Sequence, residues 1–222
     1  MRLTVGKEPV RRILKWSQRA LFACAVLLLG YCGFALADAW LFQRRQSKEL
    51  ERLLRDRRAA SAVATPQPVS LVPPKGAPAA ETGSLIGRIE IPRLVLSVVV
   101  VEGVDKTSLR RTVGHIPGTA LPGEAGNVGL AGHRDTFFRP LKDLKIKDEI
   151  QLSTLKGIFE YEVVSLRIVE PDNVGVLEPS GENVLTLVTC YPFFFVGPAP
   201  KRWIVRARQV LSQTVPPSNV KR

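Results

Sequence analysis

The stretch ENVLTLVTCYPFFFVGPAPKRWIVRARQVL, residues 182–211, decides the fold, because it contains two strand patterns around one loop. Residues 184–188 are strongly apolar, and Pro192 cannot donate to a sheet ladder, so we expect the first strand to end close to Cys190. The second strand is expected to begin at Arg202. A cysteine at the end of a strand, where the chain enters a loop, is placed for exposure rather than burial.

Strand patterns of the same kind precede this hairpin. A short helix is expected over residues 109–115 and a helical turn over residues 137–144. Short strands separated by Gly and Pro turns, with little helix, favour a closed or nearly closed β-barrel, and residues 84–211 suffice for one such core. The other expected strands are LIGRIEIP (85–92), LVLSVVVVEG (94–103), NVGLAGH (127–133), DEIQLST (148–154) and IFEYEVVSLRIVE (158–170).

A membrane anchor is predicted ahead of this domain. Residues 20–37 contain no charge, and the apolar stretch continues to Phe42 after Asp38. About 20 such residues span the hydrocarbon core of a bilayer as a helix. The alternative is a cleaved signal peptide, for which ALADA offers a small-residue cleavage pattern. Basic residues flank the span on both sides, so the positive-inside rule does not decide its orientation.

The net charge of +12 belongs mostly to this N-terminal region. The first 60 residues carry 13 Lys and Arg against 5 Asp and Glu, which accounts for +8. A nucleic-acid-binding face would need its basic residues clustered on the folded domain. We therefore expect a membrane as a partner and no nucleic acid.

The chain divides into five predicted segments. The region after the span carries a thin apolar stripe, Leu50, Leu53 and Leu54, which fits a solvated stalk or, alternatively, a short dimerising coil. The segments are a basic tail (1–19), a transmembrane signal anchor (20–42), a charged juxtamembrane helix with a Pro/Ala-rich linker (43–83), the catalytic domain (84–211) and a disordered tail (212–222).

Thiol chemistry is the chemistry that these residues can supply. Cys190 is the only cysteine beyond the apolar run, so the domain cannot form an internal disulfide. A reactive thiol needs a group that moves protons at neutral pH, and His133, after Gly132 and a strand pattern, can do so. Arg202 offers a permanent charge for an oxyanion. With two histidines and no paired cysteines, we expect no metal site and no cofactor.

Three segments closely resemble the signature blocks of the sortase family of cysteine transpeptidases. They are GHIPGTALPGEAGNVGLAGHRDTFF (114–138), TLVTCYPF (186–193) and APKRWIVRA (199–207), and the second is most similar to class D sortases. Their order and spacing also match, with 57 positions from His133 to Cys190 and 12 from Cys190 to Arg202. The resemblance implies an all-β fold, the eight-stranded sortase-type barrel with short helices, preceded by an N-terminal transmembrane helix.

The resemblance also implies a reaction. Cys190 would attack the threonine carbonyl of a Leu-Pro-x-Thr sorting signal and hold the acyl chain as a thioester. His133 would protonate the departing amine and later help to deprotonate the incoming one, while Arg202 would hold the oxyanion. The substrate-binding residues implied are Thr189, Tyr191 and Phe193.

The expected partners follow from this reaction. They are a surface protein with a C-terminal sorting signal and an amine acceptor, either a cell-wall precursor or a pilin lysine. The family resemblance places the protein in the cell membrane as a single-pass protein, with its N-terminus cytoplasmic and its catalytic domain extracytoplasmic.

Two nearby residues receive other roles, and two alternative functions stay open. We expect Asp135 to be structural or capping, and His115 matches a non-catalytic position. No acidic cluster matches the calcium site of some sortases.

One alternative is a catalytically silent, membrane-tethered β-barrel that binds a partner. The other is an L,D-transpeptidase-like enzyme, although that family has a Ser-x-Gly-Cys-type segment where this chain has Thr189 before Cys190.

Overall fold

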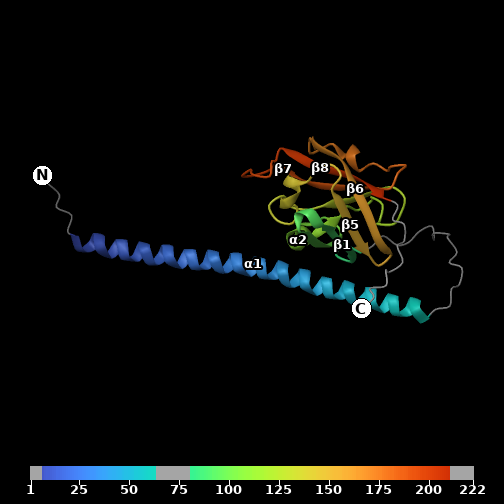
Figure 1. The fold of residues 1–222 in the computed structure, drawn as a ribbon. Helices are drawn as coiled ribbons and strands as arrows, with labels where there is room; N and C mark the ends of the chain where they lie inside the picture. Colours follow the sequence, from blue (N-terminus) through green and yellow to red (C-terminus); the bar gives the residue numbers. More distant parts are fainter. Residues whose placement is uncertain (1–6, 64–80, 211–222) are drawn as a thin grey trace. The chain divides into compact units, whose positions relative to one another are not determined.

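Eight strands form a closed barrel in the computed structural model, which describes residues 7–63 and 81–210. The strands are β1 (Leu85–Ile91), β2 (Leu96–Glu102), β3 (Val113–His115), β4 (Asn127–Ala131), β5 (Glu149–Thr154), β6 (Gly157–Val169), β7 (Val184–Tyr191) and β8 (Lys201–Val210). They pair in the order β1-β2-β3-β4-β7-β8-β6-β5, and β5 pairs with β1 to close the barrel. Figure 1 labels β1, β5, β6, β7 and β8. The predicted all-β barrel is confirmed.

Two of the eight pairings are parallel. β2 pairs with β3 and β4 pairs with β7 in parallel, whereas the other six pairings are antiparallel. The β4–β7 pairing joins segments that are far apart in the sequence, since Ala131 lies opposite Val188. The carboxyl ends of β4 and β7 therefore lie at the same end of the barrel.

The helices within residues 81–210 are short. They are α2 (Lys106–Arg111) and the 3₁₀ helices η1 (Pro92–Leu94), η2 (Arg139–Asp143) and η3 (Val174–Leu177). The helix expected over 109–115 was wrong in its position. The side chain of Asp105 accepts hydrogen bonds from the backbone of Thr107 and Ser108, so the helix begins there and ends at Arg111. Residues 113–115 instead form β3.

The core fills the interior of the barrel. Directly opposite residues on neighbouring strands point to the same face of a sheet. In β7 and β8, Leu185 lies opposite Ala207 and Leu187 opposite Val205, and all four side chains are fully buried. The alternate positions of both strands face outward, and this outer face carries the residues discussed below.

The N-terminal helix α1 (Lys7–Val63) extends through two structural units, Met1–Leu41 and Phe42–Arg222. In the first unit the apolar side chains are exposed, among them Leu27, Leu28 and Leu29. The helix is long and apolar enough to cross a membrane, which makes it a candidate membrane span. Most of the predicted Pro/Ala-rich linker and the predicted disordered tail lie outside the described residues.

The part of α1 that belongs to the second unit packs against the barrel. Gln43 donates from Nε2 to the carbonyl of Arg111 (2.8 Å) and accepts at Oε1 from the backbone N–H of Val99 (3.0 Å). Leu50 is only 1% exposed, and Glu51 lies 3.4 Å from Arg88 of β1. One face of this segment therefore covers the barrel, which differs from the solvated stalk expected from the sequence.

Candidate active site

Cys190 and Arg202 lie opposite each other in the β7–β8 pair. Cys190 is the penultimate residue of β7 and Arg202 is the second residue of β8, so both stand beside the loop that joins the two strands. Both side chains are half-buried. Because opposite residues share a face, the thiol and the guanidinium both leave the outer face of the sheet at this end of the barrel.

His133 follows the carboxyl end of β4, the strand that pairs with β7 in parallel. Ala131, the last residue of β4, is paired with Val188, and His133 lies two residues beyond Ala131 just as Cys190 lies two residues beyond Val188. Gly132 extends the pairing by donating its N–H to the carbonyl of Val188 (3.2 Å). The His133 side chain is half-buried.

Close packing fixes the backbone before His133. A side chain at Gly132 would place its Cβ 2.7 Å from the ring of Phe138, which is fully buried. The N–H of Phe138 donates to the carbonyl of His133 (3.1 Å), so the following turn also holds the backbone of His133. Because Gly132 has no side chain, it leaves room for the ring of Phe138.

Arg134 is a residue of this region that the sequence analysis did not identify. Its guanidinium donates to the carbonyls of Pro192 (3.0 Å), Phe195 (2.8 Å) and Gly197 (3.0 Å). The carbon Cζ of Arg134 also lies 5.7 Å from the centroid of the Phe195 ring. Arg134 therefore ties the β7–β8 loop to the segment that carries His133. Its partners are backbone carbonyls about 60 positions away, which no residue type in the sequence reveals.

The Arg202 guanidinium points toward the same loop. Its Nη1 donates to the carbonyls of Ala199 (3.3 Å) and Lys201 (3.0 Å). Both acceptors are neutral backbone carbonyls, one on half-buried Ala199 in the loop and one on Lys201, the first residue of β8, so neither neutralises the charge of Arg202. The arrangement places a thiol, an imidazole and a fixed positive charge at the ends of three neighbouring strands.

Thr189 faces the interior rather than the outer face. It is 2% exposed, and its hydroxyl donates to the carbonyl of Gly132 (2.7 Å). The bond ties β7 to the residue before His133, which gives Thr189 a positioning role. Its predicted contact with substrate stays a prediction.

Tyr191 and Phe193 belong to an aromatic cluster with Trp203. The Tyr191 and Trp203 rings stack with centroids 5.9 Å apart, and Phe193 meets both rings edge-on at 6.1 and 6.0 Å. These contacts support the start of the β7–β8 loop. Substrate binding by Tyr191 and Phe193 also stays a prediction.

The other two sequence candidates are His115 and Asp135. His115 is 2% exposed, and its Nδ1 lies 2.7 Å from Oε2 of Glu102, while its Nε2 lies 3.0 Å from the carbonyl of Ala120. This buried pair links β3 to β2. Asp135 is exposed. Within residues 7–63 and 81–210, no group of three or more His, Cys, Asp or Glu side chains is placed to hold a metal ion.

Comparison with known proteins agrees with the geometry. A sortase domain model matches residues 89–210. The chain is 35% identical to Sortase D of Bacillus subtilis over 191 residues, which cover 86% of this chain and 96% of that protein. A Clostridium perfringens sortase D5 transpeptidase superimposes with a TM-score of 0.60 at 26% identity, covering 76% of this chain and 98% of the other. Sortase C-1 of Actinomyces oris gives a TM-score of 0.53 at 32% identity, covering 57% and 74%.

Proposed function

The chain belongs to the sortase family and is a cysteine transpeptidase, and from this premise we propose that it cleaves a Leu-Pro-x-Thr-type sorting signal after threonine and transfers the acyl chain to an amine. The proposal assigns Cys190 as the nucleophile, His133 as the acid and base, and Arg202 as the oxyanion donor. The observation that supports it is the strand register, in which Cys190 lies opposite Arg202, and the paired residues Ala131 and Val188 are each followed two residues later by His133 and Cys190.

The first half of the reaction forms a thioester. The Cys190 thiolate attacks the threonine carbonyl carbon, and the carbonyl electrons move to oxygen, where the Arg202 guanidinium stabilises the negative charge. The tetrahedral intermediate then collapses as the C–N bond breaks. His133 donates its proton to the departing nitrogen, which leaves as a neutral amine, while the acyl chain stays on sulfur.

The second half returns the enzyme to its starting state. The neutral His133 accepts a proton from the incoming amine as its nitrogen attacks the thioester carbonyl. Arg202 again stabilises the oxyanion, and collapse of the intermediate expels the Cys190 thiolate and forms the new amide bond. The thiolate and the protonated imidazole are regenerated together, so one pair of residues serves both halves.

The proposed setting is the outer surface of a cell membrane. The candidate span in α1 supports a membrane-anchored protein, and the proposal takes from the family resemblance a single-pass protein with its N-terminus in the cytoplasm and the barrel outside. There the donor would be a surface protein with a C-terminal sorting signal, and the acceptor amine would come from a cell-wall precursor or a pilin lysine.

The experiment that tests the proposal uses the full-length protein in detergent with Leu-Pro-x-Thr-containing peptides and several amines. We expect cleavage after threonine, amine-dependent product and an acyl adduct on Cys190 in the intact mass spectrum. Cys190→Ala is expected to abolish turnover and the adduct while the thermal unfolding profile stays unchanged. Matched controls are Cys24→Ala and Cys32→Ala, which remove cysteines outside the barrel unit. Turnover by Cys190→Ala above background would refute the nucleophile, and a wild-type protein that cleaves no peptide would favour a silent binding barrel.

A further inference from the structure

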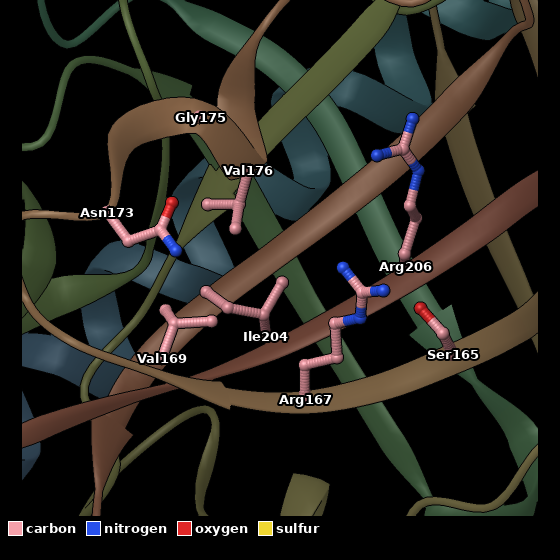
Figure 2. Close-up of a pocket in the computed structure, with 8 residues that line it drawn as sticks. All are labelled: Ser165, Arg167, Val169, Asn173, Gly175, Val176, Ile204 and Arg206. Carbon is pink, nitrogen blue, oxygen red and sulfur yellow. The ribbon is translucent and has the colours of Figure 1, made fainter.

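A cavity of about 290 Å³ opens on the outer face of the barrel, between β6, β8 and η3. Figure 2 shows Val169, Val176 and Ile204 toward one side of this cavity, and Arg167 and Arg206 toward the other. The cavity therefore has an apolar part and a basic part.

The strand register connects this cavity to the candidate active site. On β6 and β8, Val169 lies opposite Arg202, and Arg167 lies opposite Ile204. The outer face that carries Cys190 and Arg202 therefore continues along β8 into the cavity. Moving from Arg202 toward Arg206, this face first meets the apolar part, at Val169 and Ile204. Arg206 lies four residues beyond Arg202 on the same strand.

Arg206 differs from the neighbouring basic residues of β8 in the partner of its side chain. Lys201 lies 3.3 Å from Glu170, and Arg208 lies 2.9 Å from Glu182. Arg206 instead donates to the neutral hydroxyl of Ser180 (3.3 Å). Among the described residues, no carboxylate lies within ion-pair distance of Arg167 or Arg206. Two guanidinium groups therefore share one cavity without a neutralising acid from the part of the chain that is described.

We propose that Arg167 and Arg206 form a subsite for a carboxylate side chain of the donor peptide, located just before its sorting signal. The inference rests on the proposed function, because it needs a peptide whose threonine is held at Cys190. Guanidinium groups bind carboxylates through charge-assisted hydrogen bonds, and two in one cavity favour an acidic residue over its neutral amide.

The distance from Arg202 to Arg206 along β8 determines which residue of the peptide reaches the two arginines. Four residues of extended peptide cover about 13 Å, which is also the rise from Arg202 to Arg206 along β8 at about 3.3 Å per residue. With threonine at Cys190, the apolar part of the cavity lies beside the Leu-Pro portion of the signal. The residue that precedes the leucine then reaches Arg167 and Arg206.

The test compares three peptides on the full-length enzyme. The first has Glu immediately before the Leu-Pro-x-Thr signal, the second has Gln there, and the third has Gln there and Glu after the cleavage site. We expect kcat/KM to be about fivefold higher for the first peptide than for the second, as is typical of a partly exposed charge pair. The difference is expected in KM and to shrink in 0.5 M salt, where ions screen the pair.

Variants then assign this preference to the two arginines. Arg167→Gln and Arg206→Gln are each expected to bring the Glu/Gln ratio of kcat/KM close to 1, whereas the matched control Arg208→Gln keeps the wild-type ratio. Equal rates on the first two peptides, a preference for the third peptide, or a preference that survives both variants would each overturn the inference. If every peptide is cleaved without preference, the proposed function is retained and only the subsite is refuted. If no peptide is cleaved, both the proposed function and the subsite are refuted.

Discussion

Replacing Arg202 by alanine tests the proposal that the oxyanion donor lies at the start of β8. Loss of one preorganised oxyanion donor typically costs on the order of a hundredfold in rate or more. We therefore expect Arg202→Ala to lose at least about a hundredfold in kcat/KM. Arg202→Lys is expected to restore activity only in part, because a forked group is replaced by a point charge.

The neighbouring arginines of β8 lie too far along the strand from Arg202 to take its place. Arg206 and Arg208 are outward-facing like Arg202, but they lie opposite Thr186 and Val184 rather than Cys190. Arg206 is about 13 Å further along β8. At that distance in water a unit charge contributes about 0.3 kcal/mol before salt screening, which is less than a factor of two. Arg206→Ala and Arg208→Ala are therefore expected to change kcat/KM severalfold at most with a peptide that has no acidic residue before its signal.

The assay separates acylation from binding. Single-turnover formation of the thioester on Cys190 gives the acylation rate, and its dependence on peptide concentration gives the apparent affinity. Because Arg202 also donates to the carbonyls of Ala199 and Lys201, thermal unfolding of each variant checks that the loop and the barrel are intact. An Arg206→Ala variant that folds and is as damaged as Arg202→Ala would refute the reasoning.

Three further outcomes are expected. If residues 20–42 span the membrane uncleaved, the mature protein begins near Met1 and resists alkaline extraction, and a mature N-terminus at residue 38 or 40 would contradict this. Arg134→Gln is expected to lower the free energy of unfolding by about 1–3 kcal/mol and to slow acylation, measured by urea denaturation and single-turnover kinetics; unchanged kinetics would remove its positioning role. The hydrogen bond from Arg93 lowers the pKa of Asp148, so its stabilisation is present above a pH of about 4 and is lost below it. Asp148→Asn is thus expected to be less stable than wild type in urea at pH 7, and the two proteins should converge as the pH falls below about 4.

The strands were largely predictable, because side-chain alternation and proline are local signals. The apolar run before Cys190 and the missing backbone N–H of Pro192 predicted the end of this strand correctly, since β7 ends at Tyr191. The relation between His133 and Cys190 was available only through the family resemblance. Their proximity depends on a parallel pairing across 57 positions, and strand patterns do not encode which strands become neighbours.

Contacts made through backbone groups were not predictable. Arg134 finds three loop carbonyls, and Gln43 satisfies backbone groups of Val99 and Arg111. Every residue has such groups, so no composition or spacing points to them. The stripe that contains Leu50 showed that one face of the helix was apolar, but not that the barrel would cover it.

The place of β8 in the barrel has a consequence for synthesis. β8, the last strand in the part of the chain that the structure describes, stands between β7 and β6 and contributes Arg202. In a nascent chain whose residues 201–210 have not yet left the ribosome, β6 and β7 therefore each have one unpaired edge, and the barrel is not closed. The β7–β8 pairing is a local hairpin, whereas the β6–β8 pairing joins residues 33 to 50 positions apart, and non-local pairings form more slowly than local ones. If Arg202 stabilises the oxyanion as proposed, a chain that has not yet released β8 carries Cys190 without that donor.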